Sequence, residues 1–225
     1  DLAFESVVED GNQITTTALE EGSNYFWRVL ARNESGESEW SEIGIFIVPL
    51  PDTDPNPSDE NLVGYWKMDE GSGNQLLDSS GKNNHASISN PASLTWLPGK
   101  FGLALRMTGT KNSNGIVSNN ATLNTSAGIT VSVWVRPNSV SNKRIISKTN
   151  PDGFELGTNT NGKFEFRFNR ESNGTAYRLY SNQDYPSDGT TWIHVAATFD
   201  GTKSTIYVNG LEDNSATYGP ISINQ

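Results

Sequence analysis

The feature that most constrains the fold of this chain is the regular alternation of short apolar runs with turn-forming residues. Runs rich in Val, Ile, Phe, Tyr and Trp are separated by stretches of Gly, Asn, Ser, Thr and Asp. No helical period extends beyond about two turns. Short strands joined by many turns produce this pattern, so the sequence predicts an all-β chain.

A segment rich in proline and acidic residues divides the chain into two strand-rich blocks. Residues 49–60 hold Pro49, Pro51, Pro55 and Pro57 among Asp52, Asp54, Asp59 and Glu60. Proline lacks the N–H group that a sheet ladder needs and favours extended chain, while the acidic residues keep the segment solvated. The sequence therefore predicts a first domain over residues 1–48, a linker over 49–60 and a second domain over 61–225.

The first block reads as two strands with a turn between them. Residues 24–32 alternate in the manner of a strand, residues 33–36 (Asn-Glu-Ser-Gly) form a turn signal, and residues 41–48 carry Ile at every second position. The segments 19–29 and 36–41 resemble the C-terminal part of a fibronectin type III domain. The resemblance implies that Tyr25 is a tyrosine corner and that Trp40 stacks on Arg28 or Arg32. Because a complete sandwich of this type has about 100 residues, we expect the chain to begin inside a domain.

The second block contains an ordered set of motifs over residues 62–73, 98–105, 129–137, 191–201 and 206–210. Together they resemble a laminin G-like domain of the concanavalin A-like superfamily. The resemblance implies an antiparallel jelly-roll β-sandwich whose closing strand lies beyond residue 225. The residue pattern agrees, because Val131, Val133 and Val135 alternate with polar or aromatic neighbours, and the Asn-Gly pair at 209–210 is a hairpin signal.

Acidic and amide residues are concentrated in the loop region that follows the first motif of this block. Calcium binds six to eight oxygen ligands, which carboxylates, amides and backbone carbonyls supply. The resemblance implies a structural calcium ion here, with Asp69, Asp78 and Asn84 as its ligands. The alternative is that these residues cap turns, which the Asp-Ser-Ser-Gly sequence at 78–81 does readily.

The sequence offers no recognisable catalytic centre, so we expect a protein that is not an enzyme. Glycosidases of related fold use paired carboxylates on one strand. Glu155 and Glu165 each stand alone within their apolar strand patterns. His85 and His194 have no nucleophile at a telling spacing, and His194 is expected to be packed and hydrogen-bonded.

Aromatic side chains are the best guide to a ligand site, because pockets combine apolar rings with a few polar groups. The resemblance places Trp66, Trp134 and Trp192 in core positions. Tyr185 stands beside Asp184 in a polar, loop-like stretch. The sequence therefore predicts Tyr185 and Asp184 as the candidate ligand residues, with an ordinary loop aromatic as the alternative.

Composition and charge narrow the setting of the protein. The chain carries 26 acidic and 16 basic residues, for a net charge of −10, and this excludes nucleic acid as a partner. It contains no cysteine, so disulfides do not stabilise it, and this favours a bacterial source for an extracellular module. No apolar run approaches the ~20 residues that span a bilayer.

These observations lead to one functional prediction and two alternatives. The sequence predicts a non-catalytic adhesion or carbohydrate-recognition module within a large, multidomain protein that is secreted or on the cell surface, binding a glycan or a protein beside flanking domains of the same chain. The first alternative is an accessory module of a secreted polysaccharide-degrading enzyme or protease. The second is a structural spacer or a secretion-system passenger segment.

Overall fold

The computed structural model describes residues 19–20, 23–48, 60–107, 113–139, 141–149, 153–169 and 177–224. Within these ranges the chain is built from antiparallel strands, and its helical elements are two short 3₁₀ helices, Pro91–Ser93 and Ala121–Leu123. The predicted all-β class is therefore confirmed. Residues 1–18 and 49–59 lie outside the described ranges, so the predicted domain boundaries and most of the linker stay predictions. None of the described helices has the length and apolar character needed to cross a membrane.

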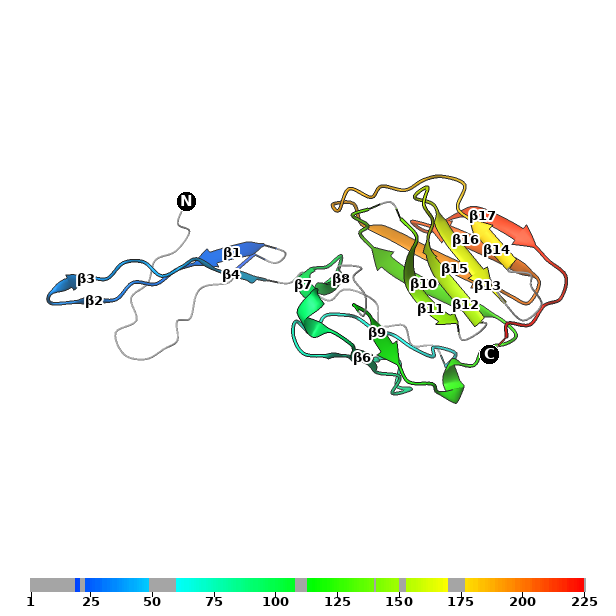
Figure 1. Ribbon diagram of the computed structural model, residues 1–225, viewed down its shortest axis with the longest axis horizontal. Helices are drawn as coiled ribbons and strands as arrows, with labels where there is room; N and C mark the ends of the chain where they lie inside the picture. Colours follow the sequence, from blue (N-terminus) through cyan, green and yellow to red (C-terminus); the bar gives the residue numbers. More distant parts are fainter. Residues whose placement is uncertain are drawn as a thin grey trace.

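The first block forms a narrow, two-stranded arm (Figure 1). Strand β1 (Asn24–Trp27) pairs with β4 (Gly44–Ile47), and β2 (Arg32–Asn33) pairs with β3 (Gly36–Glu37) around the predicted turn. The Arg28 guanidinium lies 4.1 Å from the centre of the Trp40 ring, which confirms one of the two predicted stacking partners. The Tyr25 hydroxyl accepts a hydrogen bond from the backbone N–H of Glu20 at 2.7 Å. That contact fits a tyrosine corner, but the fibronectin type III assignment stays a prediction.

The second block contains a sandwich of two four-stranded sheets (Figure 1). One sheet has the order β10-β15-β16-β17, formed by Ile129–Val135, Ile193–Phe199, Lys203–Val208 and Leu211–Thr217. The other has the order β11-β12-β13-β14, formed by Lys143–Thr149, Gly153–Thr158, Phe164–Phe168 and Tyr177–Tyr180. Side chains of period two fill the space between the sheets, including Leu156, Phe166, Val195 and Ile206, each with no exposed surface. Their burial confirms that the two antiparallel sheets pack as a β-sandwich.

A smaller set of strands with a core of its own stands beside the sandwich. Strands β5 (Gln75–Leu76), β6 (Ala86–Ile88) and β9 (Gly115–Val117) form one sheet, and β7 (Leu94–Pro98) pairs with β8 (Leu103–Met107). Leu76, Ala86 and Ile88 are buried there against partly buried residues that include Trp66 and Trp96. The loop between β7 and β8 reaches the sandwich, because the Phe101 ring packs edge-on against Trp134 at 6.0 Å.

Candidate functional site

Asp78 is the most heavily bonded of the three predicted calcium ligands. Its Oδ1 accepts hydrogen bonds from the N–H groups of Tyr65 and Ser80, each at about 2.8–2.9 Å. Its Oδ2 accepts from the Ser80 hydroxyl and the Asn84 N–H, both at 2.8 Å. Burial raises the pKa of Asp78, but the backbone N–H groups of Tyr65, Ser80 and Asn84 outweigh it and hold the pKa below its usual value. A carboxylate with two oxygens has about four acceptor positions, and all four are filled.

The other two predicted ligands differ from Asp78 and from each other. Asp69 is exposed. Asn84 is only 2% exposed, and its side-chain N–H groups donate to the Val63 carbonyl at 2.7 Å and to the Thr122 hydroxyl at 2.9 Å. The Asn84 Oδ1 atom and the Glu70 Oε2 atom are each buried with no hydrogen-bond partner among the described residues.

The fit of this loop to calcium is therefore mixed. Within the described ranges no three His, Cys, Asp or Glu residues are grouped as a metal site. Asp78 is fully accounted for as a turn-stabilising carboxylate, which matches the alternative interpretation of the Asp-Ser-Ser-Gly sequence. Asn84 Oδ1 and Glu70 Oε2 are oxygen atoms of the kind that calcium binds. The calcium ion stays a prediction.

Tyr185 and Asp184, the predicted ligand residues, do not form a paired site. The Tyr185 hydroxyl donates to Asp213 Oδ1 at 2.5 Å, and its ring packs on Phe164 with 5.0 Å between centroids. Burial raises the pKa of the Tyr185 phenol, and the hydrogen bond to Asp213 raises it further. Tyr185 thus joins the loop before β15 to β17, while Asp184 is exposed. Their role in ligand binding stays a prediction.

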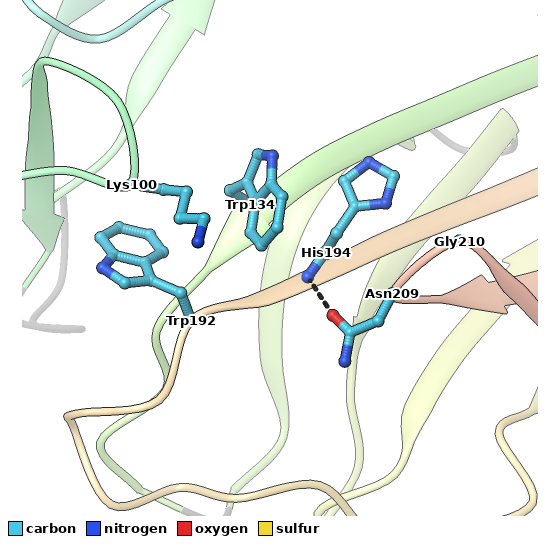
Figure 2. A pocket seen from close by; sticks show the side chains of 6 residues that line it. All are labelled: Lys100, Trp134, Trp192, His194, Asn209 and Gly210. Atoms are coloured by element: carbon cyan, nitrogen blue, oxygen red, sulfur yellow. Dashed lines mark hydrogen bonds between the residues drawn. The ribbon is translucent and has the colours of Figure 1, made fainter. Parts of the chain in front are cut away.

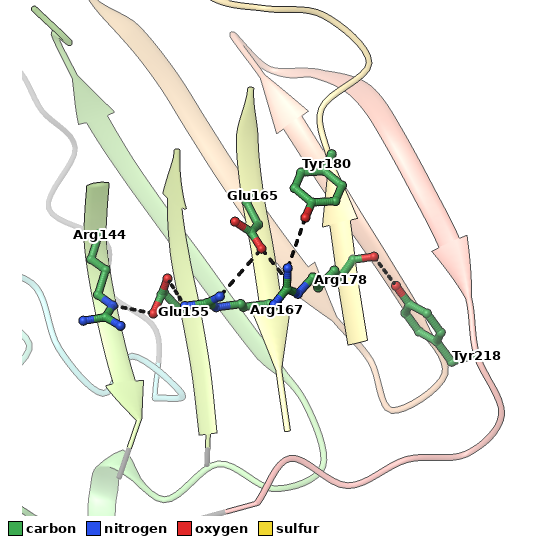
Figure 3. Close-up of polar contacts among 7 residues, drawn as sticks. All are labelled: Arg144, Glu155, Glu165, Arg167, Arg178, Tyr180 and Tyr218. Carbon is green, nitrogen blue, oxygen red and sulfur yellow. Dashed lines mark hydrogen bonds and ion pairs between the residues drawn. The ribbon is translucent and has the colours of Figure 1, made fainter. Parts of the chain in front are cut away.

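The outer face of the β11–β14 sheet carries a row of alternating charges, shown in Figure 3. Arg167 Nη2 lies 2.7 Å from Glu155 Oε1, and Arg144 Nε lies 2.7 Å from Glu155 Oε2. Glu165 Oε1 is 3.9 Å from Arg167 and 3.7 Å from Arg178. The two carboxylates that stood alone in the sequence therefore share one face, but the same guanidinium lies between them. These ion pairs connect the four strands β11, β12, β13 and β14 to one another.

The second outer face, on the β10-β15-β16-β17 sheet, holds an open pocket of about 510 Å³ (Figure 2). Its lining residues come from strand β10, from the start of β15 and the residue before it, from the β7–β8 loop and from the β16–β17 turn. They are Lys100, Trp134, Trp192, His194, Asn209 and Gly210. Two large aromatic rings with a few polar groups are the usual composition of a small-ligand site.

Strand register places these side chains together. Trp134 on β10 is paired directly with His194 on β15, and their rings lie 5.2 Å apart. The His194 ring is fixed by a 2.7 Å hydrogen bond between its Nε2 and the Ser132 hydroxyl. The His194 backbone N–H donates to Asn209 Oδ1 at 3.0 Å, which fixes the amide at the β16–β17 turn. That turn requires positive φ angles, 50° at Asn209 and 84° at Gly210, as the predicted Asn-Gly hairpin does.

Two cations lie over the two tryptophan rings. The Lys100 amino group is 5.0 Å from the centre of the Trp134 ring, and the Arg136 guanidinium is 5.0 Å from the centre of the Trp192 ring. In the view of Figure 2 the Lys100 amino group lies between the two indoles. Cation–π attraction of this kind holds the long side chains in place at the edge of the pocket.

The expectation that Trp134 and Trp192 belong to the core is wrong. Both are half-buried and face outward. Valines 131, 133 and 135 face the core from β10, so the residues between them must face out. The alternation with Val was visible in the sequence and would have placed Trp134 on the outer face. Trp66 does pack on the smaller core, as expected. His194 is packed and hydrogen-bonded as expected, but on the pocket side.

The sandwich with its jelly-roll strand order defines a protein of the concanavalin A-like class. The family model described as "Concanavalin A-like lectin/glucanases superfamily" matches residues 109–225, just over half of the chain. The chain therefore belongs to this family, Laminin_G_3. No curated protein is significantly similar to the chain in sequence.

Solved structures with similar folds include two bacterial domains. One is the binding domain of Paraclostridial Mosquitocidal Protein 1, with 19% identity and a TM-score of 0.62, which covers 74% of this chain and 42% of that one. The chain thus spans less than half the length of that relative. The other is Domain 4 of AbnA, a GH43 extracellular arabinanase from Geobacillus stearothermophilus, solved in complex with arabinotriose, with 20% identity, a TM-score of 0.55 and coverage of 72% and 80%. At these identities the similarity shows the shared fold.

Proposed function

We propose that this chain is a non-catalytic, extracellular saccharide-binding module and that the pocket between Trp134 and Trp192 is its binding site. The observation that carries the proposal is an open pocket on an outer sheet face that is lined by two half-buried indole rings beside fixed polar groups. Sugar rings present apolar C–H faces that pack on aromatic rings, and hydroxyl groups that need hydrogen-bond partners. Trp134 and Trp192 supply the first, and Asn209 and His194 supply the second.

The pocket is built to hold its shape before a ligand enters. The Ser132 hydroxyl fixes the His194 ring, and Asn209 is fixed by the His194 backbone. Trp134 is braced on one side by Phe101 from the smaller set of strands. Side chains that are already ordered lose little conformational entropy on binding, so a shallow site can still bind measurably.

A solved structure of the same fold supports the same proposal. Domain 4 of AbnA, which shares the fold, was solved with a bound trisaccharide, and the arabinanase that contains it is extracellular. That complex describes AbnA alone, but it favours the specific alternative that this chain serves a polysaccharide-degrading enzyme as an accessory module. An adhesion module and an accessory module of an enzyme would both bind a saccharide in this way. The two functions would differ in what any flanking domains do.

The test is a saccharide screen of the 225-residue chain, followed by titration of the best ligand with variants. We expect Trp192→Ala to weaken binding at least about tenfold, equivalent to about 1.4 kcal/mol. Trp40→Ala is the matched control, because Trp40 lies on the β1–β4 arm and lines no part of the pocket. Binding that survives Trp192→Ala and Trp134→Ala unchanged would contradict the assignment of the pocket, and a screen with no ligand would favour the structural-spacer alternative.

A further inference from the structure

The charge of the pocket is opposite in sign to that of the chain. The protein has a net charge of −10. Yet Lys100 lines the pocket, Arg136 stacks on the lining residue Trp192, and no carboxylate is among the described lining residues. On a chain with this excess of acid, a local pair of cations next to two indoles is a distinct electrostatic feature that attracts anions.

These two cations differ from the arginines on the opposite sheet face. Arg144, Arg167 and Arg178 each lie within 4.0 Å of a glutamate. Among the described residues, Lys100 and Arg136 form no ion pair, and their contacts are with the indole rings. An incoming anion would therefore not have to displace a carboxylate of the protein, so its binding energy would not be offset by a broken ion pair.

The geometry also places the charge where a sugar substituent would lie. Each cation sits 5.0 Å from the centre of an indole ring that lines the pocket, so a saccharide bound beside that ring would lie next to the cation. A sugar ring packed beside Trp134 or Trp192 would bring a charged group on that ring within reach of Lys100 or Arg136. A neutral sugar can accept hydrogen bonds from these cations, whereas an anionic sugar also gains the attraction between opposite charges.

We propose that the pocket selects an acidic saccharide, one whose rings carry a carboxylate or a sulfate group, and that Lys100 and Arg136 bind this group. The proposal rests on the proposed function of the pocket and adds the class of its ligand. The carboxylate and sulfate share the chemistry of a negatively charged oxygen cluster, and the experiment separates them.

The experiment measures binding of the 225-residue chain to two matched pairs by isothermal titration calorimetry. One pair is polygalacturonate and its fully methyl-esterified form, and the other is dextran sulfate and dextran. Polyglutamate serves as an anion without sugar. We expect at least one acidic polymer to bind at least about tenfold more tightly than its neutral partner and than polyglutamate, and we expect added salt to weaken that binding.

Variants assign the effect to the pocket. Lys100→Gln and Arg136→Gln should each weaken binding of the acidic polymer several-fold and reduce its salt dependence. Lys143→Gln, which removes the same charge from the exposed edge of the other sheet, should leave binding unchanged. Equal effects of Lys100→Gln and Lys143→Gln, or equal binding of polyglutamate, would overturn the proposal by showing general attraction to anions.

The outcomes also separate this proposal from the one it rests on. If the neutral polymers bind as tightly as the acidic ones and Trp192→Ala abolishes binding, the pocket binds saccharides but does not select for charge, and the acidic-ligand proposal fails alone. If no polymer binds and the wider saccharide screen is also empty, both proposals fail.

Discussion

Asp78 joins the loop over residues 78–84 to the distant backbone at Tyr65 through one carboxylate. Its four donors come from Tyr65, Ser80 and Asn84, and its own N–H donates to His85 Nδ1 at 2.9 Å. Asp78 is only 8% exposed, so water cannot replace these bonds if they are lost. This single residue therefore sets the course of the loop that leads into the smaller core.

The depressed pKa of Asp78 gives a pH dependence with a defined sign. Because the folded pKa lies below the usual value of 3.8, the ionised carboxylate stabilises the fold at pH above that value. This stability is lost as the pH falls below 3.8 towards the folded pKa. We expect Asp78→Asn to lower the free energy of unfolding by about 1–3 kcal/mol at pH 7, because its new NH₂ group would face two donors.

Urea unfolding of both proteins from pH 7 to pH 2 measures this effect. The difference in the free energy of unfolding between the parent protein and Asp78→Asn should narrow below pH 3.8. Asp78 becomes protonated in the parent protein in that range, whereas the variant has no carboxylate at this position. Asp184→Asn is the control, because Asp184 is an exposed residue. A gap that stays constant over the whole range would contradict the assignment.

At the scale of strands, the charge row on the β11–β14 sheet makes a second prediction. The side chains of Arg167 and Glu155 are 12% and 9% exposed, so their ion pair is nearly buried. We expect Arg167→Met to lower the free energy of unfolding by about 3 kcal/mol, because it leaves the nearly buried carboxylates of Glu155 and Glu165 without the cation between them. Urea unfolding at pH 7 is the measurement.

Arg178→Met provides the matched comparison for that prediction. The Arg178 side chain is 41% exposed and lies 3.7 Å from Glu165, so solvent screens the pair. We expect a loss of less than about 1 kcal/mol from this change. Equal losses from the two substitutions would show that burial of the central pair does not set its strength.

The same strands show how far the sequence leads. Alternation in residues 131–135 and 193–199 correctly predicts paired strands with one apolar face, and the Asn-Gly pair correctly predicts the hairpin at 209–210. The pocket could not be predicted in the same way, because it depends on Lys100 and Phe101 from a distant loop reaching the outer face of β10. The family resemblance predicted that Trp134 lies in the core, whereas the alternation of Trp134 with Val133 and Val135 predicts the outer face of the sheet.

Considered as a whole, the second block has two cores of different size. The sandwich core is continuous across both sheets, whereas Leu76, Ala86 and Ile88 form a small core with few buried residues. A small hydrophobic core stabilises its strands weakly, so the hydrogen bonds of Asp78 contribute a larger share of the stability in this region. A bound ion in this part would have a visible effect on thermal unfolding.

The calcium prediction can be tested on this basis by thermal unfolding of the full chain in excess calcium and in chelator. If calcium uses the unpaired Asn84 Oδ1, calcium should raise the melting temperature and Asn84→Ala should remove the rise. Asp69→Ala separates the two roles, because exposed Asp69 should matter only in calcium. Asp78→Ala should destabilise the chain equally in both buffers, since its four hydrogen bonds are made within the protein. Identical melts in calcium and chelator would assign the whole loop to turn formation.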